Sequence, residues 1–319
     1  MTDRTPAVDT DRAGSPRLAG KGATPPAPLQ IGPRRFQWGE RTFVMGIVNA
    51  TPDSFSGDGL LATGDGPTPA PIDVAVAQAR RMIAEGADLL DVGGESTRPG
   101  HAPVPAADEI DRVVPIVRAI RAALPDTPLS IDTTKAEVAA AALDAGADLI
   151  NDVWGVGPDD ALLRLAAERG APIVLMHNRA EARYTNLMVE VLADLQAAIG
   201  RAVAAGVAWE SIVVDPGFGF GKTAADNLDV LRELADLRAL GRSILLGASR
   251  KSTLGLVLDL PADQRLEATL ATTALGVAGG ADIVRVHDVR PNVRAARMAD
   301  AVVRGPAPGP YARFEGGLT

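Results

Sequence analysis

Polar residues able to bind a ligand or take part in catalysis follow short apolar segments along most of the chain. They are Asn49, Asp53, Glu95, Thr97, Arg98, Asp132, Asn151, His177, Asp215, Ser249, Arg250, Lys251 and His287. The apolar segments have the length and β-branched content of buried strands. If the strands are parallel, their carboxyl ends meet on one side of the fold, so these side chains are predicted to line one site.

Hydrogen-bond acceptors form the first group of candidates. Asp132, Asn151 and Asp215 follow the third, fourth and sixth apolar segments. A buried carboxylate needs a donor-rich partner, and the adjacent N–H groups of a flat 2-amino-4-oxopyrimidine edge would supply one. Each residue also has a structural alternative: Asp132 could cap the next helix, and Asn151 or Asp215 could tie a turn.

The second group is cationic. Its members are Arg98, Lys251, Arg285 and His287. Arg285 and His287 lie two residues apart in the last apolar segment, so their side chains are predicted to share a face of a strand. With Asn49 they could hold a pyrophosphate and its Mg²⁺. Alternatively, Arg285 could form an ion pair with Asp282 or Asp288, and His287 could belong to the core.

Three loops add to the predicted site. The segment "GASRKS", residues 247–252, precedes an apolar helix, and N–H groups at a helix start favour an anion. The glycine- and serine-rich loops "NATPDSFSGDG" and "GGESTRPG" have the composition of lids, which ordinary surface loops share. By contrast, "DPGFGFGKT" only resembles a Walker A loop, because Pro216 stands where its first glycine must be.

The elements that must position these residues alternate regularly. The predicted strands are 42–48, 89–92, 129–131, 149–153, 173–176, 212–214, 244–247 and 283–286, and the predicted helices are 73–84, 108–123, 135–145, 159–169, 187–205, 227–240, 266–278 and 292–303. This alternation predicts an α/β fold, either a (β/α)8 TIM barrel or an open, doubly wound sheet. Polar residues after nearly every strand favour the barrel, which brings all those ends to one mouth.

The termini differ in composition from this central region. Residues 1–33 are rich in Pro, Ala and Gly and lack apolar periodicity, which predicts a disordered N-terminal tail. We therefore expect the barrel to span residues 34–304, followed by a flexible C-terminal tail at 305–319.

Composition excludes several classes of function. The formal net charge of -8 argues against binding to nucleic acid or to an anionic membrane. The chain has no Cys, and its three His residues are far apart, so disulfides and a structural zinc site are not expected. Without an apolar segment long enough to span a bilayer, the chain is expected to be cytoplasmic.

An ordered series of motifs identifies a family. The chain contains "MGIVNATPDSFSGDG", "DVGGESTRPG", "SIDTTKAEVA", "LINDVWG", "VLMHNR", "DPGFGFGKT", "LLGASRKS" and "VRVHDV". Together, over about residues 41–303, they resemble the dihydropteroate synthases. The resemblance implies a TIM-barrel homodimer in folate synthesis. It would condense 6-hydroxymethyl-7,8-dihydropterin diphosphate with 4-aminobenzoate, releasing pyrophosphate.

The resemblance also implies roles for individual residues. The pterin would be held by Asp132, Asn151, Asp215 and Lys251, with Met176 packing on its ring and Gly247 leaving room for it. The diphosphate and Mg²⁺ would be held by Asn49, Arg285 and His287. The 4-aminobenzoate site would be framed by Thr97, Arg98, Pro99, Phe220, Lys251 and Ser252.

One departure from the family pattern leaves alternatives open. The first loop has "SFSGDG" where the family commonly has Ser-Phe-Ser-Asp-Gly-Gly, so the register of Asp58 is shifted by one residue. Two other functions are compatible with a pterin pocket in such a barrel. They are a pterin-dependent methyltransferase domain and a non-catalytic pterin-binding paralogue.

Overall fold

The computed structural model describes residues 25–50, 70–95, 104–155, 157 and 159–305. Within them, eight parallel strands close into a barrel in the order β10-β3-β4-β5-β6-β7-β8-β9. The strands are β3 (Phe43–Asn49), β4 (Leu89–Gly93), β5 (Leu129–Asp132), β6 (Leu149–Asp152), β7 (Ile173–Met176), β8 (Ile212–Asp215), β9 (Ser243–Leu246) and β10 (Ile283–Val286). The predicted TIM barrel is therefore confirmed, and the open sheet is excluded.

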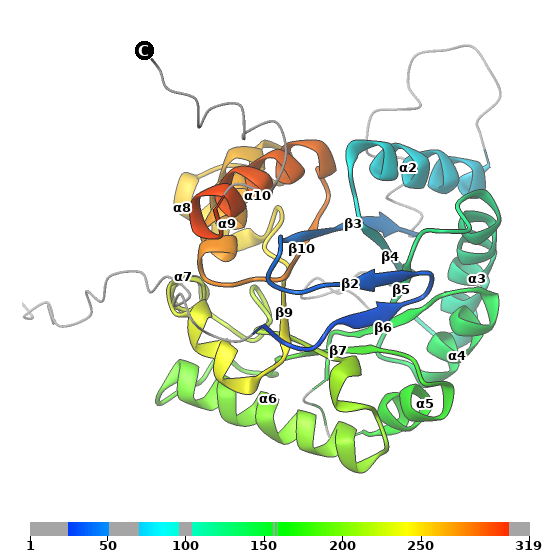
Figure 1. Ribbon diagram of the computed structural model, residues 1–319, viewed down its shortest axis with the longest axis horizontal. Coiled ribbons are helices and arrows are strands. Elements are labelled where there is room, and N and C mark those ends of the chain that lie inside the picture. Colours follow the sequence, from blue (N-terminus) through cyan, green and yellow to red (C-terminus); the bar gives the residue numbers. More distant parts are fainter. Residues whose placement is uncertain (1–24, 51–69, 96–103, 156, 158, 306–319) are drawn as a thin grey trace, which may run out of the picture.

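Helices surround the strands and form the outer layer (Figure 1). They are α2 (Pro71–Glu85), α3 (Ala106–Ala123), α4 (Ala136–Ala145), α5 (Ala161–Arg169), α6 (Leu187–Ala204), α7 (Ala224–Arg232), α8 (Ser252–Leu258), α9 (Leu266–Ala278) and α10 (Val289–Val303). Short 3-10 helices lie at η1 (Trp209–Ser211), η2 (Leu234–Leu240) and η3 (Ala262–Gln264). In the described part of the chain, no helix is both long and apolar enough to cross a membrane.

One predicted helix, residues 227–240, is divided in the structure. The α-helix α7 ends at Arg232, and η2 continues the chain as a 3-10 helix. Leu234, Leu237 and Leu240 are all buried. Their spacing of three matches the three residues per turn of a 3-10 helix, so this geometry turns all three leucines to the core.

Glycines end several of the helices. Gly86 after α2 and Gly146 after α4 adopt left-handed conformations, with φ of 105° and 113°. Glycine lacks a Cβ and takes this conformation without strain, which lets each helix stop and the chain enter the next buried strand.

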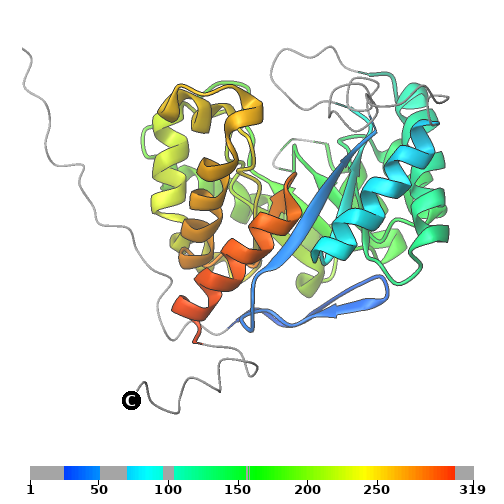
Figure 2. The same cartoon turned by 90° about the horizontal axis from the view of Figure 1, so that it is seen from above.

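A short hairpin covers the end of the barrel where the strands begin (Figure 2). It consists of β1 (Leu29–Ile31) and β2 (Arg34–Phe36), paired antiparallel. Leu29, Ile31, Phe36 and Trp38 are buried in one cluster with inward-facing residues of the barrel strands. The prediction that the disordered tail extends to residue 33 is therefore wrong for Leu29–Ile31, because alternating apolar residues give the hairpin a buried face. Residues 1–24 and 306–319 lie outside the described residues.

We expect the hairpin to contribute to stability. Ile31→Ala removes a fully buried side chain and should lower the free energy of unfolding by about 2–5 kcal/mol. Arg35→Ala, on the exposed side of the same hairpin, should change it by no more than about 0.5 kcal/mol. Denaturant unfolding of both variants checks this, and equal effects would contradict the packing described here.

Candidate functional site

The carboxyl ends of the strands place several of the predicted polar residues around one charged cluster. Arg285 of β10 reaches across the barrel interior, where its Nε donates to Asp91 Oδ2 at 2.6 Å and its Nη2 to Asp132 Oδ2 at 2.7 Å. Asn151 of β6 donates through Nδ2 to the same Asp91 oxygen at 3.0 Å. The cluster therefore joins four strands that are separated by up to 194 positions in sequence.

These contacts decide between two of the alternatives. Asp132 does not cap the following helix, because α4 begins after Lys135 without a side-chain cap. Nor does Arg285 pair with Asp282 or Asp288. Asp282 pairs with Arg238, and Asp288 pairs with Arg250.

Asp91 was not among the residues predicted from sequence. It is fully buried, and its carboxylate anchors both Arg285 and Asn151. An acid inside the apolar segment "LLDVG" was the available signal, because a buried carboxylate requires partners.

Among the described residues, two carboxylate oxygens of the cluster are left without a donor. Asp91 Oδ1 and Asp132 Oδ1 are buried and have no hydrogen-bond partner among the described residues. An acceptor left buried without a donor costs about 1–3 kcal/mol, so such atoms mark a place where a donor belongs. Asp132 Oδ1 therefore favours a ligand with N–H groups.

Asp215 of β8 uses one oxygen in a turn. Its Oδ1 accepts from Gly217 N at 2.7 Å, so the alternative that it ties a turn is half right. Its Oδ2 lies on the other side, 3.9 Å from the position that a Cβ at Gly247 would take. That same position is 3.9 Å from Arg285 Cβ, so Gly247 leaves space between the two side chains.

Burial makes the charges of this site unusual. Desolvation raises the pKa of Asp132 to about 7, although the nearby Arg285 opposes this rise. Desolvation also raises the pKa of Asp215 to about 6, against the hydrogen bond from Gly217. For Lys251, desolvation and the adjacent Arg285 lower the pKa to about 7. These perturbed groups, gathered at one barrel mouth, are typical of a functional site.

Two predicted residues lie together beside this cluster. Lys251 immediately precedes α8, and its Nζ lies 3.7 Å from the centre of the Phe220 ring. Phe220 lines a cavity of about 160 Å³ together with Asp132 and Asn178. The flat ring and the cation therefore form one wall next to Asp132.

The remaining predicted residues occupy the rim and the ends of strands. Met176 is buried at the end of β7, in register with Asp215 of β8. Asn49 ends β3 and is partly exposed, and Ser252 is exposed as the first residue of α8. His287 follows β10, and its Nδ1 and backbone N lie 3.0 and 3.2 Å from Ser249 Oγ.

Thr97, Arg98, Pro99 and Asp58 lie outside the described residues. The two ends of the segment that carries Thr97 are nevertheless joined, because Glu95 Oε1 accepts from Val104 N at 3.2 Å. Lys135 forms ion pairs with Glu95 and with the buried Glu109. These contacts hold Glu95 at the 160 Å³ cavity, which Glu95 and Glu109 both line.

Comparison with known proteins gives one consistent family. Residues 45–287 match the family model described as "Pterin binding enzyme". The chain is 51% identical over 277 residues to the dihydropteroate synthase of Clostridium beijerinckii, covering 86% of this chain and 100% of the relative.

Solved structures agree with this match. The dihydropteroate synthase of Clostridium difficile, determined in the presence of pteroic acid, superposes with a TM-score of 0.78 at 45% identity, covering 84% of this chain and 99% of that one. The enzyme of Xanthomonas albilineans, in complex with 7,8-dihydropteroate, gives 0.77 at 39% identity, covering 86% and 98%.

The raised pKa of Asp215 generates a prediction about pH. Asp132 takes up a proton below about pH 7 and Asp215 below about pH 6. A protonated carboxyl group accepts N–H groups less well, so affinity for 6-hydroxymethylpterin should fall by about tenfold between pH 7.5 and pH 5. Calorimetry at both pH values measures this change. The Asp215→Asn variant, which cannot take up that proton, should bind weakly and with a smaller pH dependence. Equal wild-type affinity at the two pH values would exclude Asp215 as an acceptor for the pterin.

Proposed function

The chain belongs to the dihydropteroate synthase family of pterin-binding enzymes, and from this we infer that it is a transferase of folate biosynthesis. It joins 6-hydroxymethyl-7,8-dihydropterin diphosphate to 4-aminobenzoate, giving 7,8-dihydropteroate and pyrophosphate. The observation that carries the assignment to this site is Asp132 Oδ1, which is buried and has no hydrogen-bond partner among the described residues. Asn151 lies next to Asp132 in the strand register. The pterin edge is rich in N–H donors, and such acceptors complement it.

For the pterin, we propose that Asp132, Asn151 and Asp215 face its hydrogen-bonding edge, with Lys251 near its carbonyl oxygen. The buried Met176 packs on the ring, and Gly247 leaves room because it has no side chain. Buried, preorganised groups of this kind favour a rigid planar ligand, since they need little rearrangement when it binds.

For the diphosphate, the proposed ligands are Asn49, Arg285 and His287, which follow or lie in β3 and β10. These strands pair directly, so the three side chains come from neighbouring positions of the barrel. The guanidinium of Arg285 stays charged, because Asp91 and Asp132 raise its pKa despite the desolvation that opposes them. Its charge favours pyrophosphate as a leaving group.

We further propose that Mg²⁺ binds together with the diphosphate. Among the described residues, no cluster of three or more His, Asp or Glu side chains could hold a metal by itself. Mg²⁺ does not need such a cluster, because it keeps several waters and commonly binds through substrate phosphates and one or two protein oxygens. Asn49 would supply a protein oxygen, and the ion would neutralise charge on the departing pyrophosphate.

For 4-aminobenzoate, Phe220 and Lys251 form the described part of the site, and Ser252 stands near its carboxylate. Thr97, Arg98 and Pro99 are assigned to the same subsite by their motif. In the reaction, the amine nitrogen attacks the exocyclic carbon of the pterin, the C–N bond forms and the C–O bond to the diphosphate breaks. The nitrogen then loses a proton. An aromatic amine is neutral and nucleophilic at pH 7, so this step needs no strong protein base.

Two further proposals concern the cell and the assembly. We place the enzyme in the cytoplasm, because a multiply charged diphosphate ester does not cross a bilayer unaided. We also propose a homodimer formed through α8 and α9. Leu256, Val257, Leu258 and Leu275 are exposed on these two adjacent helices, and such an apolar surface is unusual on a monomer.

The dimer predicts a mass in solution of twice the 32.9 kDa chain. Leu256→Asp should shift it to the monomer mass, because the new charge would be buried against the partner copy. Val189→Asp on α6, an equally apolar and exposed position, should leave the dimer intact. Light scattering after gel filtration measures all three masses, and a monomeric wild type would contradict the proposal.

An assay of pyrophosphate release tests the activity. Release should require both the dihydropterin diphosphate and 4-aminobenzoate, and it should stop with a chelator and return with Mg²⁺. A methyltransferase domain or a non-catalytic paralogue would release none. Release that survives chelation would exclude the role of Mg²⁺.

Arg285→Gln should reduce the turnover number by an amount equivalent to about 2–4 kcal/mol of transition-state stabilisation. Affinity for 6-hydroxymethylpterin, which lacks the diphosphate, should change by no more than about tenfold, the share expected from loss of the contact to Asp132. Kinetics, calorimetry and thermal unfolding of this variant are compared. If stability falls while turnover and pterin affinity decline equally, Arg285 has only a structural role.

A further inference from the structure

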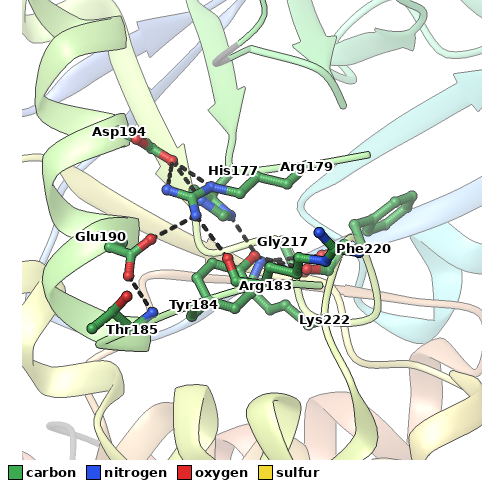
Figure 3. A network of polar contacts seen from close by, with 11 residues as sticks. His177, Arg179, Arg183, Tyr184, Thr185, Glu190, Asp194, Gly217, Phe220 and Lys222 are labelled. Carbon is green, nitrogen blue, oxygen red and sulfur yellow. Dashed lines mark hydrogen bonds and ion pairs between the residues drawn. The ribbon is translucent and has the colours of Figure 1, made fainter. Parts of the chain in front are cut away.

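A second polar network lies beside the site, between the loop after β7 and the loop after β8 (Figure 3). The second loop, residues 217–221, contacts the backbone of residues 177–179. A Cβ added at Gly217 would collide with His177 O, and one added at Gly221 would collide with Arg179 O. Both glycines also have positive φ, of 70° and 51°, so only glycine permits this close approach.

Lys222 joins the two loops. Its Nζ lies 2.8 Å from His177 Nδ1 and donates to Gly217 O and Phe220 O, each at 3.2 Å. Desolvation lowers the pKa of Lys222 to about 7, opposed by the nearby carboxylate of Asp215. In its ammonium form the group has three N–H donors, and these three acceptors satisfy all of them. Lys222 is the lysine of the segment that resembles a Walker A loop. In the structure it donates to backbone oxygens of its own loop.

His177 is oriented for this contact by its other nitrogen. Because Nδ1 accepts from Lys222, Nε2 carries the proton and donates to Asp194 Oδ2 at 3.1 Å. Desolvation and the neighbouring Lys222 lower the pKa of His177 to about 4, which keeps the ring neutral at pH 7. The sequence predicts that His177 lines the ligand site, because it follows a barrel strand. In the structure it is fully buried and belongs to this second network instead.

The remaining members brace the same contacts from α6 and the loop before it. Arg179 donates to Asp194 Oδ2 through Nε and Nη2 at 2.9 and 2.7 Å, and to Glu190 Oε2 at 2.7 Å. Its guanidinium stacks 4.8 Å from the Tyr184 ring centre, and Tyr184 Oη donates to Gly221 O at 2.7 Å. The loop is thus held from both sides of Phe220.

Phe220 is the link to the ligand site. Its carbonyl oxygen is bound by Lys222, while its ring points away from the network, as Figure 3 shows. The ring meets Lys251 and lines the cavity beside Asp132. Lys222 therefore contacts this wall through the backbone of residue 220.

We propose that Lys222, oriented by His177 and Asp194, is a positioning residue that fixes Phe220 as a wall of the 4-aminobenzoate subsite. The proposal rests on the proposed function, because it takes 4-aminobenzoate as the ligand of that wall. The proposal predicts that loss of the contacts of Lys222 and His177 weakens binding of 4-aminobenzoate more than binding of the pterin.

The test measures the Kd of 4-aminobenzoate by calorimetry, with 6-hydroxymethylpterin and pyrophosphate saturating the rest of the site. Lys222→Met should raise this Kd by about tenfold, the loss expected for hydrogen bonds from a charged donor. The Kd of 6-hydroxymethylpterin should stay within about twofold. In steady-state kinetics the same variant should raise KM for 4-aminobenzoate, with little change in the turnover number.

A conservative variant and a matched control separate positioning from general stability. His177→Asn keeps an acceptor near the place of Nδ1, so its Kd for 4-aminobenzoate should rise less than that of His177→Phe. The double variant Lys222→Met with His177→Phe should bind like Lys222→Met alone, because the two residues act as one unit. Arg238→Met removes another partly buried cation, paired with Asp282 at the start of β10, and should lower stability without changing either Kd.

The outcomes are distinguishable. Unchanged Kd for 4-aminobenzoate in both Lys222→Met and His177→Phe, or equal weakening of both ligands, would overturn the positioning role. A wild type that binds 4-aminobenzoate but releases no pyrophosphate would overturn the proposed function alone. A wild type that binds no 4-aminobenzoate would overturn both.

Discussion

Arg285 carries a positive charge into the interior of the barrel, and the upper layer of that interior is built around it. Alone, a buried guanidinium would cost several kcal/mol, and so would each of the carboxylates of Asp91 and Asp132. Their pairing makes the layer tolerable, yet Arg285 takes only one oxygen from each acid. The second oxygen of Asp132 stays without a described partner. The pairing that stabilises these charges therefore leaves one acceptor, Asp132 Oδ1, for a ligand. Asn151 donates to the same Asp91 oxygen as Arg285 does.

Such a polar upper layer depends on an apolar lower one. Phe43, Met45 and Leu89 fill the barrel near the start of its strands, and the hairpin of Leu29–Ile31 and Arg34–Phe36 covers them. The apolar packing lies at this end, while the buried charged groups lie at the other. This separation is general for TIM barrels, whose sites are built from the loops at the carboxyl ends of the strands.

The sequence predicts what depends on local pattern and misses what depends on distant partners. The buried strands and most of the helices follow from periodicity, and the structure agrees with them, apart from residues 227–240, which are divided between α7 and η2. Leu29–Ile31 was missed because a three-residue strand is too short for a pattern and stands in a proline-rich context. Asp91 was missed because its partners lie 60 and 194 positions away, where only the closed barrel brings them. The site residues at 97–99 lie outside the described residues, so their roles rest on the motif.

The second polar network extends to Asp215. Its Oδ1 accepts from Gly217 N, its backbone oxygen accepts from His177 N, and Gly217 O accepts from Lys222. A continuous series of hydrogen bonds therefore runs from an acceptor proposed for the pterin to the lysine that holds Phe220. The loop that carries Phe220 makes each contact of this series, so a shift of Phe220 would strain them. These contacts therefore favour one position of Phe220 relative to Asp215, and so relative to the proposed pterin end of the site.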